Sequence, residues 1–290
     1  MVDRVRVLLD TDIGNDIDDA VCLAYLLAHP RCDLLGITTV SAEPKARAKL
    51  ASVLCRAAGR DVPILPGAAD PLASPPLQGP PPQAAALARW PHETTFPRGE
   101  AAEFLCRTIR AHPGQVTLLT IGPLTNVASL FAADPEIPSL LDSLVMMAGL
   151  FLGTAGKAEW NVRCDPHAAA RVYAAPVRRH RSVGLDVTTR VRMPARAFLD
   201  RCDTPLLRPV ADMAATWFAE RPYLSFHDPL AAATLFDPGL CSFARGTVTV
   251  TPDGVTSWRA HDGGPHEVAV DVLPEAFLQH HFDVLGAFPA

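Results

Sequence analysis

Five aspartates lie within ten residues near the N-terminus: Asp10, Asp12, Asp16, Asp18 and Asp19. Carboxylates this close repel one another, and the repulsion raises their pKa values unless a positive charge lies among them. A hard divalent cation that takes oxygen ligands would supply that charge. The alternative is that Asp18 and Asp19 favour the start of a helix while the other acids are solvated in a loop. Five acids directly after a hydrophobic strand favour a metal or catalytic site.

Two other acidic motifs fit this stretch poorly. A calcium loop of the EF-hand type needs Gly at its sixth position and Glu at its twelfth. Counted from Asp10, Gly14 is the fifth residue and Val21 is the twelfth, so that motif is excluded. An Asp-x-Asp phosphoryl-transfer nucleophile is open in principle, but nothing in the loop resembles a phosphate cradle.

Two polar clusters later in the chain could contribute to the same chemistry. One spans residues 159–166 and contains Glu159, Asn161 and Asp165. The other is the pair His227 and Asp228 before a proline. Asp228 alone could simply cap a helix whose first residue is proline. The adjacent histidine indicates an acid together with a metal ligand.

The elements that must position these residues alternate between strands and helices. The apolar residues 5–9 predict a buried strand and residues 18–29 a helix, which places the acids at the carboxyl end of a strand, where open parallel sheets bind ligands. Further strands are predicted at 34–40, 62–65, 116–121, 144–147 and 182–187. Helices are predicted at 44–58, 99–112, after the turn 122–126, at 166–173, over most of 195–236, and at 274–285.

The C-terminal region changes character, because residues 247–250 and 266–270 flank a Pro-Asp-Gly turn like an antiparallel hairpin. The alternation as a whole predicts one α/β domain over residues 1–290. Its sheet is expected to be open, mostly parallel and flanked by helices, with a small antiparallel appendage near the C-terminus.

Residues 71–98 interrupt the alternation with eight prolines. A connection this long without regular structure is either a mobile active-site flap or a flexible surface loop. Trp90 and His92 lie in it, and we expect them either to cover a bound base or to be ordinary exposed loop residues.

Composition narrows the partners and the location. The net charge of −5 gives no basic field, so a nucleic-acid polymer is not expected to bind. The apolar runs are shorter than the roughly 20 residues that span a bilayer, and the N-terminus lacks signal-peptide character, so no membrane partner and a cytoplasmic location are expected. Seven cysteines without a C-x-x-C pair suggest buried thiols rather than disulfides or a zinc site.

The motifs together resemble the inosine-uridine preferring nucleoside hydrolases over nearly the whole chain. The matching blocks, in the family's order, are Asp10-Thr11-Asp12-x-Gly14, Asp18-Asp19-Ala20, Ile121-Gly122-Pro123-Leu124-Thr125-Asn126, Met147-Ala148-Gly149, Glu159-Trp160-Asn161, Gly184-Leu185-Asp186-Val187-Thr188 and His227-Asp228-Pro229. The resemblance implies an open α/β fold, a bound calcium ion and hydrolysis of the N-glycosidic bond of a small ribonucleoside. It also implies a homodimer or a homotetramer.

Roles follow from the resemblance by position. Calcium would be held by Asp12, Asp19, Asp228 and the backbone carbonyl of Ile121. Asp12 would also take a proton from the attacking water, and His227 would protonate the leaving base. An oxocarbenium-like transition state needs negative charge near the sugar and an activated water on the face opposite the base.

The remaining roles concern the sugar. Asp18 and Asn161 would contact the ribose, Glu159 the 5′-hydroxyl, and Met147 would be a further substrate contact. Asp10 would lie behind them and orient its neighbours.

Three departures from the family pattern bear on these roles. The tract from Asp12 to Asp18 is two residues longer than usual, so Asp16 and Asp18 are both candidates for the ribose contact, and the Asp-Asp-Ala ending favours Asp18. Glu43 stands where the family has a ribose-binding Asn, and the segment between Met147 and Glu159 lacks an expected Asn.

Glu43 therefore suggests an altered sugar contact, with inosine and uridine as poor substrates that Glu43→Asn would improve. The alternative is that Glu43 points outward and begins the helix at Pro44. Rival functions are hydrolysis of a modified or natural-product nucleoside, and a catalytically weak relative that binds nucleosides.

Overall fold

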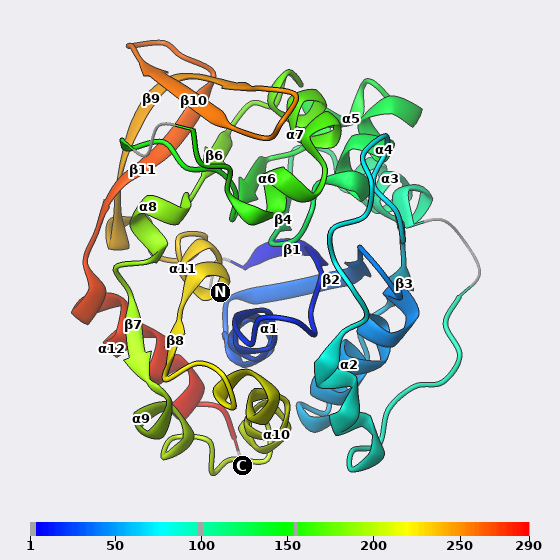
Figure 1. The fold of residues 1–290 in the computed structure, drawn as a ribbon. Helices are drawn as coiled ribbons and strands as arrows, with labels where there is room; N and C mark the ends of the chain where they lie inside the picture. Colours follow the sequence, from blue (N-terminus) through cyan, green and yellow to red (C-terminus); the bar gives the residue numbers. More distant parts are fainter. Residues whose placement is uncertain (1–3, 98–100, 154–155, 290) are drawn as a thin grey trace.

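A computed structural model of the protein describes residues 4–97, 101–153 and 156–289. In this part of the chain nine strands form one sheet in the order β10-β9-β11-β6-β5-β4-β1-β2-β3 (Figure 1). The strands are β1 (Val5–Thr11), β2 (Cys32–Thr39), β3 (Ile64–Pro66), β4 (Val116–Thr120), β5 (Ser143–Met146), β6 (His180–Ser182), β9 (Cys241–Val250), β10 (Thr256–Ala260) and β11 (His266–Val272). Neighbours from β3 to β11 pair in parallel, whereas β9 pairs antiparallel with both β11 and β10.

Helices cover both faces of this sheet, which creates two hydrophobic cores. Successive residues of β1 point to opposite faces: Val7 and Leu9 join one core and Leu8 the other. The first core receives α1 (Asp18–Ala28), α2 (Pro44–Ala57), α10 (Leu207–Phe218), α11 (His227–Ala233) and α12 (Pro274–Gly286). The second receives α3 (Ala101–Ala111), α4 (Thr125–Ala133), α5 (Ile137–Leu140) and α7 (Pro166–Tyr173). Short elements complete the chain: η1 (Pro82–Ala88), α6 (Trp160–Cys164), α8 (Leu185–Thr188), β7 (Arg192–Pro194), α9 (Ala195–Leu199), β8 (Tyr223–Ser225) and η2 (Pro238–Leu240).

The fold class expected from the sequence is confirmed: a large, mostly parallel sheet flanked by helices, with antiparallel strands near the C-terminus. Those strands are not a separate appendage, because β11 pairs in parallel with β6 and so continues the main sheet. The hairpin partner of β9 across the Pro-Asp-Gly turn is β10, and not residues 266–270 as the sequence predicted. A separate two-stranded antiparallel sheet, β7 with β8, divides the region 195–236 that was expected to be mostly helical.

The predicted strand 182–187 is wrong beyond its first residue. The strand β6 ends at Ser182, and the chain turns at Gly184 into the helical turn α8. The Leu185 amide donates to the Gly149 carbonyl at 2.8 Å, so a hydrogen bond outside the sheet holds the turn. The start of the helix predicted at 99–112 lies outside the described residues, and the described helix runs from Ala101 to Ala111.

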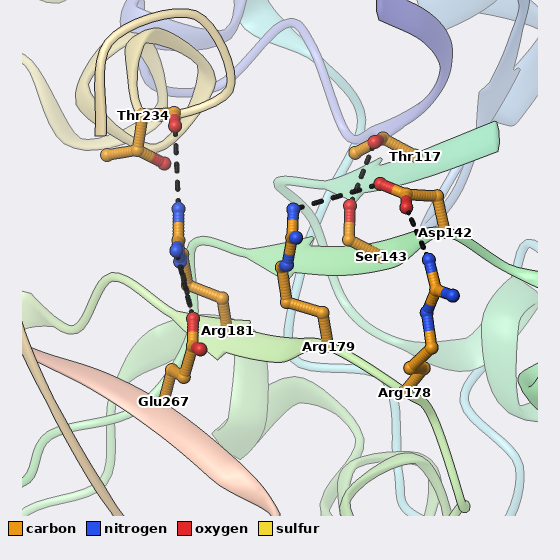
Figure 2. Close-up of polar contacts among 8 residues, drawn as sticks. All are labelled: Thr117, Asp142, Ser143, Arg178, Arg179, Arg181, Thr234 and Glu267. Carbon is orange, nitrogen blue, oxygen red and sulfur yellow. Dashed lines mark hydrogen bonds and ion pairs between the residues drawn. The ribbon is translucent and has the colours of Figure 1, made fainter. Parts of the chain in front are cut away.

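Polar contacts hold the strands together at their amino-terminal ends (Figure 2). The hydroxyls of Thr117 and Ser143 are 2.8 Å apart across β4 and β5. Asp142, just before β5, accepts a hydrogen bond from Arg178 at 2.9 Å, and Arg181 of β6 forms an ion pair of 2.9 Å with Glu267 of β11. The arginines at this end are thus paired with acids of neighbouring strands, and the acidic site lies at the opposite, carboxyl end.

None of the helices in the described ranges has both the length and the apolar character that crossing a bilayer requires.

Candidate active site

A cavity of about 580 Å³ opens at the carboxyl ends of the parallel strands, within the size range of small-molecule sites. Its lining includes Asp12, Asn15, Asp16, Asp18 and Asp19 of the acidic loop and the start of α1, Gln78 and Pro82 of the Pro-rich segment, Ile121, Met147, Glu159, Trp160 and Asn161 from the middle of the chain, and Leu185, Thr216, Trp217, Glu220, Arg221, His227 and Asp228 from its last third. The site therefore joins residues that are more than 200 positions apart.

Three carboxylates form the tightest group in this cavity. Asp18, Asp19 and Asp228 each offer an oxygen atom, and these atoms all lie within 4.8 Å of one another. The backbone amide of Asp228 donates to Asp18 at 3.0 Å, and the Thr11 hydroxyl donates to Asp19 at 2.5 Å. The first bond holds α11 against α1 and the second holds α1 against the end of β1, so the fold itself brings the three carboxylates together.

The group carries an electrostatic cost that a cation would remove. All three side chains are at most 4% exposed, and burial raises the pKa of each well above its ordinary value. Repulsion from neighbouring aspartates raises the pKa values further. Hard divalent cations take oxygen ligands such as these converging carboxylates, so the residues fit an ion of this class.

Asp12 lies in the same cavity but outside this group of three, which contains Asp18 in place of the Asp12 predicted from the sequence. Its Oδ2 accepts a hydrogen bond of 2.6 Å from the side-chain amide of Gln78. Burial raises the pKa of Asp12, while the charge of Arg47 and the Gln78 bond lower it. Gly122 leaves the space that its Oδ1 needs, because a Cβ at that position would lie 2.7 Å from it.

Asp10 lies behind the cavity and does not line it. It is fully buried, and it accepts hydrogen bonds from the Thr38 hydroxyl and from Asn126 at 2.7 Å. Burial raises its pKa to about 7. Because Asn126 also bonds the Ala68 amide at 2.9 Å, Asp10 helps to hold the loop after β3 against β1.

The middle of the chain contributes a capped helical turn to the cavity. Glu159 caps α6 by accepting from the amides of Asn161 and Val162 at 2.8 and 3.1 Å, and burial raises its pKa to about 7. The side-chain amide of Asn161 donates to the backbone carbonyls of Ile121 and Met147, both at 3.0 Å. All four predicted residues, Ile121, Met147, Glu159 and Asn161, therefore meet at one wall, where Asn161 holds the Ile121 carbonyl.

His227 lines the cavity at the start of α11. Its Nδ1 lies 2.7 Å from the Thr188 hydroxyl, which fixes the ring. Burial, followed by the charge of Arg192, lowers the pKa of His227 to about 4, so the ring is neutral near pH 7. A neutral imidazole donates one hydrogen bond rather than carrying a mobile positive charge.

The structure does not bring Glu43 to the cavity. Its side chain is exposed, and Glu43 precedes α2 in a left-handed backbone conformation with φ of 54°. This placement matches the alternative in which Glu43 points outward and begins the helix. Asp16 and Asp18 both line the cavity, so the geometry keeps both as candidates for the ribose contact.

The Pro-rich segment reaches the cavity through residues that the sequence analysis did not single out. Gln78 and Pro82 line it, whereas Trp90 and His92 do not. The Trp90 indole is turned away by a hydrogen bond of 2.8 Å to Asp212, and His92 bonds the Trp90 carbonyl. The expectation that Trp90 or His92 covers a bound base therefore finds no support in the geometry.

A second missed group lies at the end of α10, where Thr216, Trp217, Glu220 and Arg221 form a further wall. The Arg221 guanidinium lies 5.2 Å from the centre of the Trp217 ring. An aromatic ring that lines a cavity can stack on a planar heterocycle. The sequence signal for this wall was a tryptophan in an otherwise ordinary amphipathic helix.

Comparisons with known proteins agree on one family. Residues 7–279 match the family model described as inosine-uridine preferring nucleoside hydrolase. A non-specific ribonucleoside hydrolase, RihC, of Escherichia coli O157:H7 is 30% identical, with 99% of this chain and 100% of that protein covered. A probable uridine nucleosidase 2 of Oryza sativa is 29% identical over 86% of this chain and 79% of that protein.

Solved structures show the same architecture. A structure titled plant nucleoside hydrolase, PpNRh1 enzyme, aligns with a TM-score of 0.84 and 25% identity, covering 98% of this chain and 99% of that one. An inosine-guanosine nucleoside hydrolase aligns with a TM-score of 0.86 and 21% identity, covering 99% and 100% of the two chains, and this second likeness concerns the fold alone.

Proposed function

Because the chain belongs to the inosine-uridine preferring nucleoside hydrolase family, we propose that the acidic cavity is where it hydrolyses the N-glycosidic bond of a ribonucleoside. The products are the free base and ribose. The observation that carries the proposal is the convergence of buried Asp18, Asp19 and Asp228 beside Asp12 in a cavity of about 580 Å³. This is a nucleosidase reaction, in which water attacks the anomeric carbon.

The negative side chains of the cavity suit the charge that develops on the sugar. The transition state of glycoside cleavage resembles an oxocarbenium ion, so buried carboxylates next to the ribose stabilise it. Asp12 would accept the proton of the attacking water, since it is a carboxylate on the cavity wall that is oriented by Gln78 and Gly122. Asn161 and one of the pair Asp16 and Asp18 would bind the ribose hydroxyls, with Glu159 close to the 5′ end.

Calcium would be held by Asp19 and Asp228, with Asp12 and the Ile121 carbonyl as further ligands from the resemblance and Asp18 as the third member of the buried group. When bound, calcium lowers the pKa of a water molecule and attracts vicinal hydroxyls. The departing base would receive a hydrogen bond from His227, whose ring is fixed by Thr188. Trp217 lines the same cavity and would stack on that base.

A homodimer or homotetramer stays a prediction from the resemblance, and a cytoplasmic location stays a prediction from the sequence. Hydrolysis of a modified nucleoside stays a second prediction, and Glu43, one of the departures that suggested it, lies outside the cavity.

The test is a panel of inosine, guanosine, adenosine, uridine and cytidine incubated with the purified protein and calcium. We expect free base and an equal amount of reducing sugar from at least one nucleoside. Chromatography measures the base and a colorimetric assay the sugar. If none of the five releases base above the rate in buffer, the proposed function is wrong.

The variant Asp12→Asn is the matched control, since the amide keeps the size of the carboxylate but cannot accept a proton from water. Loss of a general base costs about 10²- to 10⁴-fold in turnover. We expect that loss with an unchanged circular dichroism spectrum. Turnover within about threefold of the unaltered protein would remove Asp12 from this role.

A further inference from the structure

Arg47 is a charged side chain with no exposed surface, next to the acidic cavity but not lining it. It lies in the first turns of α2. A buried guanidinium costs free energy unless its donors are satisfied. Here they are, and the acceptors are backbone carbonyls rather than one carboxylate.

These carbonyls belong to three separate segments of the chain. The Arg47 Nη1 atom donates to the carbonyls of Asp12 and Ile13 in the acidic loop, the second at 3.2 Å. The Nε atom donates to Ser41 and Ala42 at 2.7 and 3.0 Å. The Nη2 atom donates to Gly79 of the Pro-rich segment at 3.2 Å. A planar fork with five N–H groups can satisfy all three directions at once.

The segment 41–43 has an unfavourable backbone conformation at two of its three residues. Ser41 has a φ of 71° and Glu43 a φ of 54°, a region that residues other than glycine rarely adopt. Such strain persists only where the surroundings over-determine it. The two carbonyls bound by Nε supply part of that constraint.

The third segment matters most for the cavity, because Gly79 directly follows Gln78. The Gln78 amide donates to Asp12 Oδ2 at 2.6 Å and to Asn15 Oδ1 at 3.1 Å. Its own Oε1 is buried without a partner in the described part of the protein. Only the NH₂ side of the Gln78 amide is therefore held by hydrogen bonds, so its position also depends on the backbone, which Arg47 binds at the adjacent Gly79.

We propose that Arg47 is a positioning residue: its guanidinium fastens the Pro-rich segment to the acidic loop and thereby sets the Gln78 amide against Asp12. The consequence for turnover rests on the proposed function. The fastening itself is a structural property, so it is measurable without any substrate.

The structural test is limited proteolysis of the folded protein with chymotrypsin. Leu77 is exposed and directly precedes Gln78, so the bond between them becomes cleavable when this segment loosens. We compare Arg47→Met and Arg47→Lys with Arg56→Met as matched control. Arg56 is also an arginine of α2 that binds the same segment, but through an exposed ion pair with Glu93.

We expect cleavage after Leu77 to be about tenfold faster in both Arg47 variants and unchanged in Arg56→Met. Lysine keeps the charge but cannot reach three segments from one nitrogen, so Arg47→Lys decides the question if Arg47→Met does not fold. Equal cleavage rates in folded Arg47→Lys and in the unaltered protein would overturn the proposal.

The kinetic test separates positioning from general stability. We expect kcat to fall about tenfold in Arg47→Lys and in Gln78→Ala, with KM changed by less than about threefold, because misplacing a reacting group lowers the rate more than binding. The double variant should be no slower than Arg47→Lys alone, because both changes remove the same contact between the Gln78 amide and Asp12. If the losses in kcat of the two single variants multiply in the double variant, Arg47 does not act through Gln78.

If the unaltered protein cleaves no nucleoside, the proposed function fails. The proteolysis still tests whether Arg47 holds the Pro-rich segment against the acidic loop.

Discussion

At the scale of single residues, Glu43 combines an exposed side chain with a left-handed backbone conformation at the start of α2. Asparagine adopts that conformation more readily than glutamate. We expect Glu43→Asn to leave kcat/KM for inosine and uridine within about twofold of the unaltered protein. Relief of about 0.5–1 kcal/mol of strain would raise the melting temperature by about 1–2 °C in a chain of this length.

The control for this prediction is Glu43→Ala, which removes the carboxylate without offering a residue suited to positive φ. It should leave kcat/KM unchanged as well, and it should not raise the melting temperature. A rise of tenfold in kcat/KM for either nucleoside in Glu43→Asn alone would instead return Glu43 to the role of a specificity residue.

Sequence could identify the acidic residues because their signal is local. Asp12, Asp18 and Asp19 follow one hydrophobic strand, and the strand alone fixes the edge of the sheet at which they lie. Arg47 and Gln78 carry no such signal. An arginine in an amphipathic helix is normally solvent-exposed, and its burial depends on where the aperiodic Pro-rich segment passes.

At the scale of elements, α12 is attached to α1 through a buried histidine. The His281 ring stacks on Tyr25 and Phe277 at centroid distances of 5.2 and 5.4 Å, and neither of its ring nitrogens has a hydrogen-bond partner in the described residues. Burial, with a smaller contribution from His280, lowers its pKa to about 3. The folded state therefore holds this ring neutral over a range in which the unfolded state does not.

This difference makes stability depend on pH. Between the unfolded pKa of about 6.5 and the folded pKa of about 3, only the unfolded chain binds the proton, so stability falls as the pH falls. At pH 5 this one group costs about 2 kcal/mol relative to pH 8. We expect His281→Leu to lose about that much less stability between pH 8 and pH 5 than the unaltered protein, measured by urea unfolding at both pH values.

Phe277→Leu is the control, because it perturbs the same cluster without a titrating group. It should lower the free energy of unfolding by similar amounts at pH 8 and pH 5. A pH dependence in His281→Leu as steep as that of the unaltered protein would mean that His281 is protonated in the folded state.

The wrongly predicted strand at 182–187 shows that a local hydrophobic pattern does not include contacts with distant segments. Residues 182–187 alternate like a strand, yet only Ser182 belongs to β6. The chain turns where Gly184 packs against Gly149 and Phe151, so closely that a Cβ would lie within 3.0 Å of both. That contact comes from a segment more than 30 residues away, so no local window contains it.

At the scale of the whole molecule, strand order explains why the site lies where it does. From β1 the chain proceeds to β2 and β3 on one side, and β4 and β5 lie on the other. Open parallel sheets bind ligands at such a reversal, beyond the carboxyl ends of the strands. Asp12 follows β1 and Ile121 follows β4, so these two of the four predicted metal positions flank that crevice. The alternation of elements predicted a parallel sheet, but not this order, which depends on crossovers that leave no local pattern.

The same convergence predicts that a cation links distant parts of the chain. Asp18 and Asp19 come from α1 and Asp228 from α11, so only the folded protein brings their oxygens together. A ligand that binds only the folded state stabilises it by about 2.7 kcal/mol at 100 times its dissociation constant. In a chain of this length that corresponds to a rise of about 4 °C in melting temperature.

We expect this rise when calcium is added back to chelator-treated protein, with the melting temperature measured by scanning fluorimetry. Asp228→Asn should abolish the rise, whereas Asp142→Asn, at the opposite end of the sheet, should retain it. Equal melting temperatures with chelator and with calcium in excess would show that the buried acids hold no calcium ion.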